Sequence, residues 1–390
     1  MILKINVKSL LLMSMFIIIY VLLNYYLGKR INIFVRRFYS NSKQYILFIM
    51  VLVLSTSYIV YSLLKYTFEI DMNWMKNLGN YWMAIFYYLV FLFFLSDIIF
   101  LLFKVSNLRD TNLYGYINNI HYSGGFVVLL SAVLIVYGTF NAYSYKTNYY
   151  DISIDKNINN VNELKIAMIA DLHYDSSRID FFSKVVELIN KENVDLICLC
   201  GDIIDENTNK NELKILLNDL KKLKATYGVY AVYGNHESYL KYQQEYKEGL
   251  KNIGIRLLED ETVHVNNSFY IIGRKDISIN RGNSNHRLDI DNLIKDINRN
   301  QLILLLDHQP VDIKNVENTD IDLQLSGHTH KGQLFPNNLV TRLMFATDHG
   351  LYKKNNYSLI VTSGIGTWGP PVRVGSNGEI VFIKLKPDYE

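Results

Sequence analysis

Four long apolar segments in the first third of this 390-residue chain restrict its fold more than any other feature. A helix needs about 20 consecutive apolar residues to span a bilayer. Segments of that length with aromatic ends are poor candidates for buried helices of a soluble domain. The predicted spans are Ser9–Leu27, Tyr45–Leu64, Tyr81–Phe103 and His121–Phe140. We therefore expect a transmembrane region over residues 1–142, with about four helices and a multi-pass position in the cell membrane.

Two features of these spans have more than one interpretation. Lys4 and Lys8 precede the first span, as they would in a signal peptide. However, the span has no small-residue cleavage site and three more spans follow it, which favours an uncleaved helix. Asp97 is the one carboxylate inside a predicted span, and it marks either a functional site or a helix–helix contact.

The charges of the short loops predict the orientation, because loops rich in lysine and arginine remain cytoplasmic. The first loop carries Lys29, Arg30, Arg36, Arg37 and Lys43, and the third carries Lys104 and Arg109. In the second loop, two lysines are offset by Glu69 and Asp71. The first and third loops are therefore expected inside, with both termini and the large C-terminal domain extracytoplasmic.

The remainder of the chain has the composition of a globular protein, and at this length we expect more than one domain. Residues 143–163 are polar and read as a linker, with an early alternation that suits one edge strand. Over residues 164–390, a β-α-β-α-β pattern gives way to a strand-rich second half. This order predicts an α/β domain built as a two-sheet sandwich flanked by helices.

Charge and cysteine content limit the partners. A net charge of +3 is too small to indicate binding of a polyanion, so we expect no nucleic-acid partner. Cys198 and Cys200 are two residues apart in a predicted strand and point to the same face. That arrangement suits core packing better than a disulfide.

Five predicted strands are followed by residues that can bind a metal. They are Asp171 with His173, Asp202, Asn235 with His236, His308, and His328 with His330. Taken singly, each group is typical of a turn. Their repetition directly after apolar runs indicates one site, because the carboxyl ends of strands form the ligand crevice of open α/β sheets.

The chemistry of this set predicts the cofactor. Carboxylates, imidazoles and one amide oxygen without a thiolate suit Mn, Fe or Zn. Leaving His236 aside, seven ligands are too many for one four-coordinate ion but suit two divalent ions that share a carboxylate. Two ions about 3.5–4 Å apart stabilise both oxygens in the displacement at a phosphoester and generate hydroxide from water. His236 is then free to act as an acid.

The motifs DLH, GDIID, GNHE, DHQP and GHTHKGQ resemble the signature of the calcineurin-like metallophosphoesterase superfamily, over roughly Lys165 to Lys386. The stretch TSGIGTWGPPVRVGS and the N-terminal spans resemble its bacterial membrane-associated branch. The resemblance implies the αββα sandwich of the metallophosphoesterase type. It also implies one ion held by Asp171, His173, Asp202 and His330, and a second held by Asp202, Asn235, His308 and His328.

Further roles follow from the same resemblance. His236 is implied to protonate the leaving group or to stabilise the transition state, and Asp205 to pair with His236 or to serve as a helix or loop cap. The protein-phosphatase branch carries an arginine where this chain has Glu206, which disfavours phosphoprotein substrates.

Three further residues are weaker candidates. Arg373 either neutralises substrate phosphate or braces a loop, and His349 is either near the site or merely exposed. Trp368 is expected to anchor a loop rather than to stack on substrate.

The expected function is therefore that of a membrane-anchored, dinuclear-metal phosphoesterase with a phosphoester substrate. Its location favours lipid-linked or envelope substrates. A general or nucleotide phosphodiesterase without lipid preference is the enzymatic alternative. The non-enzymatic alternative is a metal-binding sensing module, which the retention of every ligand and of His236 disfavours.

Overall fold

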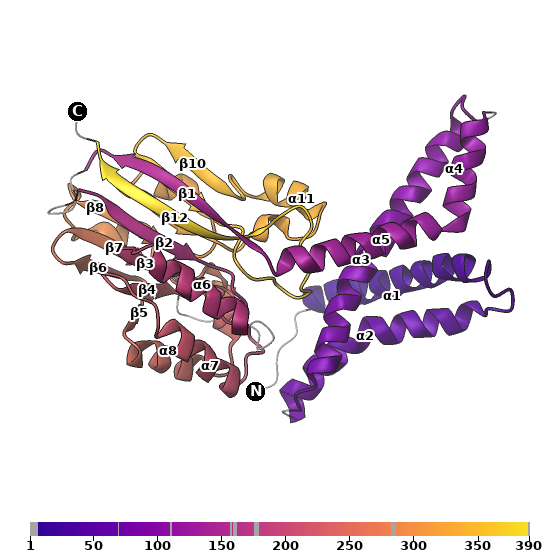
Figure 1. Cartoon of the computed structure of the whole chain (residues 1–390), viewed down its shortest axis with the longest axis horizontal. Coiled ribbons are helices and arrows are strands. Elements are labelled where there is room, and N and C mark those ends of the chain that lie inside the picture. Colours follow the sequence, from indigo (N-terminus) through magenta and orange to yellow (C-terminus); the bar gives the residue numbers. More distant parts are fainter. Residues whose placement is uncertain are drawn as a thin grey trace. The chain divides into compact units, whose positions relative to one another are not determined.

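The computed structural model describes residues 7–68, 70–109, 111–156, 158, 162–174, 179–281 and 286–388. Two compact units make up the chain (Figure 1). We call Met1–Thr139 with Gly369–Val372 the helical unit, and Phe140–Trp368 with Arg373–Glu390 the sheet unit. Each unit is described by itself.

The helical unit contains the predicted membrane helices. Its helices are α1 (Val7–Val35), α2 (Gln44–Phe68), α3 (Asn73–Val105), α4 (Asn112–Ser123) and α5 (Gly125–Ala142), the last of which runs into the sheet unit. Among the described residues, four of these helices are long and apolar enough to span a membrane, namely α1, α2, α3 and α5. The prediction of four candidate spans is therefore confirmed. Small residues allow close packing between them: a Cβ on Gly79 of α3 would lie 2.7 Å from the backbone of Tyr58 on α2.

Two helix boundaries differ from the prediction. Lys29 and Arg30 were expected in a loop, but α1 continues through them to Val35 because both residues are good helix formers. The predicted span His121–Phe140 was wrong at its start, since Gly124 adopts φ 64° and ends the separate helix α4. Thr111 caps the other end of α4 by accepting a hydrogen bond from the Tyr114 N–H.

Asp97 lies at a contact between three helices. Tyr26 of α1 donates a 2.6 Å hydrogen bond to Asp97 Oδ2, and the Arg30 guanidinium lies 3.4 Å from Oδ1. His121 of α4 lies 3.5 Å from the same oxygen. These partners support the interpretation of Asp97 as a helix–helix contact. Because Arg30 lies in α1 beside Asp97, it does not count among the loop charges that indicate the membrane orientation.

The sheet unit contains two six-stranded sheets. The first has the order β1 (Tyr145–Ile154), β12 (Gly378–Pro387), β2 (Leu164–Ile169), β3 (Leu196–Cys200), β4 (Val229–Val232) and β5 (Ile255–Leu257). The second has the order β10 (Gly350–Lys354), β11 (Tyr357–Val361), β9 (Leu323–Ser326), β8 (Leu302–Leu306), β7 (Phe269–Gly273) and β6 (Glu261–Val265). Strands β2 to β5 are parallel to one another, and so are β7, β8, β9 and β11. Within residues 143–163, β1 is the expected edge strand and pairs along its whole length with β12.

Helices cover the outer faces of both sheets. Helices α6 (Ile179–Lys191), α7 (Lys210–Leu220) and α8 (Gln243–Asn252) lie on the first sheet (Figure 1). Helices α9 (Ile290–Ile294) and α10 (Ile313–Val316) pack against the second. Alternate residues of β2 point to opposite faces of the first sheet. Ala167 and Ile169 pack in the core under the helices, and Ile166 and Met168 pack in the core between the two sheets. Cys198 and Cys200 are free and lie in the core between the sheets, as expected. The predicted αββα sandwich is confirmed.

One expected strand is a hairpin instead. The run HVNNSFYIIG forms the end of β6 and all of β7, joined by a turn at Asn266 and Asn267. These asparagines have φ of 51° and 55°, which is the left-handed conformation that a tight hairpin turn requires.

Candidate metal centre

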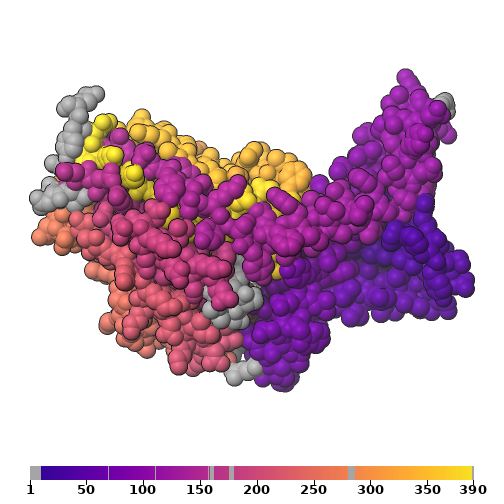
Figure 2. Space-filling model, in the orientation of Figure 1, coloured from indigo at the N-terminus to yellow at the C-terminus, as the bar shows by residue number. Residues whose placement is uncertain are grey.

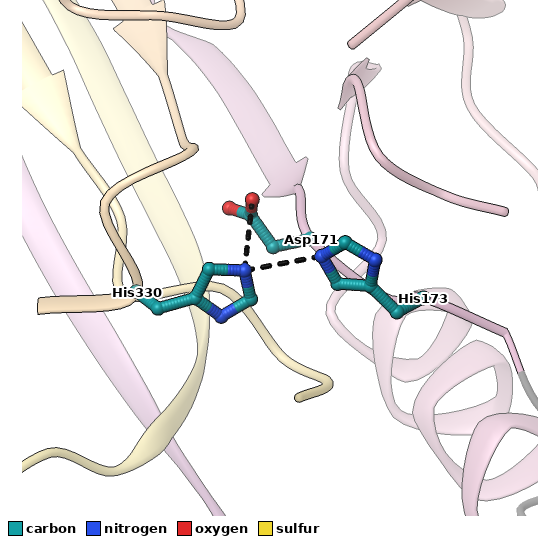
Figure 3. Close-up of side chains that lie close together, drawn as sticks. All are labelled: Asp171, His173 and His330. Carbon is teal, nitrogen blue, oxygen red and sulfur yellow. Dashed lines mark hydrogen bonds and ion pairs between the residues drawn. The ribbon is translucent and has the colours of Figure 1, made fainter. Parts of the chain in front are cut away.

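Both sheets deliver side chains to one place, at the carboxyl ends of β2, β3 and β4 in the first sheet and β8 and β9 in the second. Asp171, His173 and His330 form one group of possible ligands, and Asp202, His308 and His328 form another. Within each group, one ligand atom per residue lies within 4.8 Å of the others. His330 Nε2 lies 3.1 Å from His173 Nε2 and 3.4 Å from Asp171 Oδ1 (Figure 3).

Asp202 belongs to the second group and also faces the first. Its Oδ2 is 3.2 Å from His308 Nε2 and 3.8 Å from His173 Nε2. One carboxylate is therefore within reach of imidazoles from both groups, which is the position that a bridging ligand needs.

Three buried atoms of the site form no hydrogen bond among the described residues: His173 Nδ1, Asn235 Oδ1 and His308 Nε2, the last of which faces Asp202 Oδ2 at 3.2 Å. Buried polar atoms are rarely left unpaired in native proteins, because each costs free energy. A divalent cation would satisfy Asn235 Oδ1 and His308 Nε2, and all three atoms belong to residues that the sequence predicts as ligands. The residues present therefore fit a metal site.

The loops that carry the ligands have an unusual backbone. Asp171, His173, Asp202, His328 and His330 all have φ between 43° and 72°. Residues other than glycine rarely adopt this left-handed conformation, and when they do they concentrate at functional sites. Glycines leave room for the carboxylates: a Cβ would lie 2.1 Å from Asp202 Oδ1 at Gly234, and 2.4 Å from Asp171 Oδ2 at Gly327.

Burial sets the charge of most imidazoles. It lowers the pKa of His173 and of His328 to about 4 and the pKa of His330 well below its usual range, so these rings are neutral, as metal ligands must be. Burial would also lower the pKa of His308, but the Asp202 carboxylate raises it well above its usual range. His308 Nδ1–H donates to the Cys200 carbonyl at 2.9 Å, which turns Nε2 towards Asp202.

His236 is held by two carboxylates. Its Nδ1 lies 3.0 Å from Asp205 Oδ1 and also contacts Glu206 Oε2, while its Nε2 lies 4.0 Å from Asp202 Oδ2. Burial by itself would lower the pKa of His236, but the hydrogen bonds to Asp205 and Glu206 raise it to about 11. The pairing of Asp205 with His236 is therefore present in the structure. Sequence reasoning noted Glu206 only as a replacement for arginine and missed this contact.

Glu237 is a further residue that sequence reasoning missed. Its buried carboxylate accepts four backbone N–H bonds, from Ile203 at 2.7 Å, Gly234 at 2.8 Å, Asp202 at 3.0 Å and Ile204 at 3.2 Å. It thereby joins the loop after β3 to the loop after β4, and both loops carry ligands. The signal for it was the last letter of the GNHE motif.

Three weaker candidates have clear positions. The buried Arg373 guanidinium donates to the carbonyls of residues 363, 364 and 366, and it also contacts His330 Nδ1 at 3.4 Å. It braces the loop and orients a ligand, rather than facing a substrate. His349 Nε2 contacts Glu379 at 3.2 Å and belongs to none of the ligand groups found in the described part of the chain. Trp368 is 52% exposed, and the Gln333 side-chain amide holds the loop there by hydrogen bonds to the backbone N–H and carbonyl of Trp368.

Comparisons with known proteins agree with this geometry. The family model described as calcineurin-like phosphoesterase matches residues 164–332, the range that contains all the candidate ligands. An "Uncharacterized metallophosphoesterase" of Helicobacter pylori is 37% identical over 228 residues, which are 58% of this chain and 60% of that protein. A Campylobacter jejuni protein, also an uncharacterized metallophosphoesterase, is 31% identical over 304 residues, 77% of this chain and 79% of that protein.

A third relative, from Danio rerio, is described as "Transmembrane protein with metallophosphoesterase domain". It is 30% identical over 271 residues, which are 66% of this chain and 62% of that protein. This chain thus spans less than two thirds of the length of the Helicobacter pylori and Danio rerio relatives. The family match covers the strands and loops that form the metal centre. The chain belongs to the calcineurin-like metallophosphoesterase family.

Proposed function

We propose that the protein is a membrane-anchored phosphoesterase that hydrolyses phosphoester bonds with two divalent ions of Mn, Fe or Zn. The observation that carries the proposal is the position of Asp202. It belongs to one ligand group and its Oδ2 also lies 3.8 Å from His173 Nε2 of the other, while the buried Asn235 Oδ1 has no hydrogen-bond partner among the described residues. Asp171, His173 and His330 would hold one ion, and Asn235, His308 and His328 the other. Asp202 would contribute to both.

Each part of the site then has a role. When bound, such ions neutralise charge on the phosphoryl oxygens and activate water as the nucleophile. The Nδ1 atom of His236 contacts Asp205 and Glu206, and its Nε2 atom faces Asp202. Nε2 is therefore the atom that would donate a proton within the site. Proton donation to a leaving group by a positioned side chain contributes about 10²–10⁴-fold in rate.

The contacts of one residue favour a substrate held at the bilayer. Asn141 lies in the last turn of the candidate span α5 and belongs to the sheet unit. Its Nδ2 donates to the backbone carbonyls of Arg373 at 3.1 Å and Ser376 at 2.7 Å, and the Arg373 guanidinium contacts the ligand His330. Arg373 thus connects Asn141, at the end of the span, to the metal ligand His330. Lipid-linked or envelope phosphoesters fit this arrangement, because tethering raises the local concentration of such substrates.

The proposed orientation rests on the loop charges that remain after Lys29 and Arg30, which lie in α1, are left out of the count. Arg36, Arg37 and Lys43 lie between α1 and α2, and Lys104 and Arg109 lie at and after the end of α3. These charges favour a cytoplasmic position for both connections. The sheet unit would then lie outside the cell membrane.

Activity of the full chain in lipid nanodiscs tests the proposal. The chain is loaded with Mn, Fe or Zn and given p-nitrophenyl phosphate, bis-p-nitrophenyl phosphate, nucleotides, a phospholipid and the soluble analogue of that lipid. We expect faster hydrolysis of the lipid than of its analogue, loss of rate in His236→Ala, and no loss in His264→Ala. His264 is an exposed histidine on β6 and serves as the matched control.

Two results would count against this account. Absence of hydrolysis with all three metals on every substrate would refute the proposed phosphoesterase activity. Equal rates on the lipid and its soluble analogue would instead support a general phosphodiesterase without lipid preference.

A further inference from the structure

Helix α11 (Asn337–Met344) has its apolar side turned away from the protein. The exposed apolar residues of α11 and its approach are Phe335, Leu339, Val340, Leu343 and Met344, with exposed fractions of 44%, 50%, 51%, 89% and 71%. No residue of α11 is buried. Its spacing, 339, 340, 343 and 344, places the apolar side chains in one stripe, which a helix of a soluble domain turns inward. The helix lies at the surface of the sheet unit, beside the second sheet (Figures 1 and 2).

Contacts of its polar side hold α11 in this orientation, so the apolar stripe stays at the surface. Thr341 Oγ1 donates a 2.6 Å hydrogen bond to Asp348 Oδ2. The backbone carbonyl of Asp348 accepts a 2.6 Å bond from Thr329, which stands between the ligands His328 and His330. Close packing holds the start of the helix, since a Cβ on Gly332 would lie 2.2 Å from the backbone nitrogen of Asn338.

Hydrogen bonds also connect the start of α11 to the end of a candidate membrane span. The Phe335 N–H donates to the Val374 carbonyl at 2.8 Å, and the Val374 N–H donates to the Gln333 carbonyl at 2.9 Å. The residues around Val374, Arg373 and Ser376, accept the two hydrogen bonds from Asn141. All these residues belong to the sheet unit, and Asn141 lies in the last turn of α5. Hydrogen bonds through residues 373–376 therefore connect the segment before α11 to Asn141, where the span ends.

We propose that α11 is an interfacial helix that inserts its apolar stripe into the lipid layer next to the end of α5. Interfacial helices lie in the plane of the bilayer surface and bury their apolar face about 5–10 Å deep. The eight residues of α11 are about 12 Å long, which suits a shallow contact of this kind. The exposed Arg342 lies beside Leu343 and is available to lipid phosphate groups.

Insertion would bring the lipid surface to the metal centre. The Phe345 ring, directly after α11, lies 6.2 Å from the ring of the ligand His328. A lipid phosphoester would then reach the ligands while its chains stay in the lipid layer. This consequence, unlike the insertion itself, rests on the proposed phosphoesterase function.

Fluorescence quenching in proteoliposomes tests the insertion without relying on activity. Cys198 and Cys200 are fully buried, so a cysteine introduced by Leu343→Cys takes up a fluorescent label selectively. Lys251→Cys, at an exposed position on α8, is the matched control. The full chain is reconstituted in phosphatidylcholine and phosphatidylglycerol. We expect brominated acyl chains to quench the label at 343 and aqueous iodide to quench the label at 251.

Two outcomes would overturn the proposal. Equal quenching of both labels by iodide would mean that the stripe faces water. Protection of the label at 343 from both iodide and brominated lipid would mean that protein covers the stripe, either the helical unit or a second copy of the chain.

Activity of Leu343→Glu separates this inference from the proposed function. The substitution should lower hydrolysis of a phospholipid several-fold and leave hydrolysis of bis-p-nitrophenyl phosphate unchanged, with Leu343→Met as the control. Loss of both activities would contradict the inference, as would loss of neither. If the wild-type chain hydrolyses nothing, the proposed function fails while the quenching experiment still decides the insertion.

Discussion

Replacement of Glu237 by glutamine is the sharpest test of how the metal centre is held. Each carboxylate oxygen of Glu237 accepts two backbone N–H bonds: Oε1 from Ile203 and Ile204, and Oε2 from Asp202 and Gly234. Glutamine keeps only one oxygen. In Glu237→Gln, two N–H groups therefore lose their acceptor and face an NH₂ group, whichever way the amide is turned.

The size of the effect follows from this count. A buried donor that loses its partner costs about 1–3 kcal/mol, so two such donors cost about 2–6 kcal/mol. The cost falls on the loops that position Asp202 and Asn235, because Glu237 joins them. Loss of an outer residue that supports metal ligands typically lowers metal affinity about 10–100-fold. We expect a loss of metal affinity in this range, together with a lower melting temperature.

Metal titration and thermal unfolding of the full chain in detergent measure both effects. Glu187→Gln is the control, because Glu187 is an exposed glutamate on α6. Metal affinity and melting temperature of Glu237→Gln equal to those of the control would refute the positioning role of Glu237.

Two further predictions follow from the polar contacts. Asp205→Asn and Glu206→Gln should each lower the raised pKa of His236, which is about 11, because each removes one carboxylate from Nδ1. The acid form would then be lost at lower pH, so the alkaline limb of the pH–rate profile should move down; a profile unchanged in both variants would contradict the pairing. Asp97→Asn should lower the melting temperature of the full chain more than Asp97→Glu, because the buried Arg30 would lose its counter-charge. Equal melting of both variants would contradict that contact.

Local sequence signals predicted the features that depend on residue type and spacing. The short apolar runs of β2 and β3 indicated buried strands, and the residues after five strands indicated the metal centre. The hairpin at Asn266 could have been predicted as well, because paired asparagines between apolar runs favour a tight turn. The start of α4 after Thr111 and its end at Gly124 carried similar signals.

Other features depend on tertiary contacts that spacing does not encode. Glu206 reaches His236 across 30 residues of sequence, and Glu237 bonds to the loop after β3 from the loop after β4. The stripe on α11 has the spacing of an amphipathic helix, but spacing does not determine which face meets the protein. That face is decided by the polar contacts of Thr341 and by the packing at Gly332.

The metal content of the purified, active chain decides whether the site holds two ions. We expect two ions per chain by elemental analysis, loss of hydrolysis on chelation, and recovery when Mn, Fe or Zn is returned. Asn235→Ala should retain close to one ion, because its ligand group would be incomplete while Asp171, His173 and His330 remain. An active chain that holds a single ion, or that keeps full activity after the metal is removed, would contradict the account.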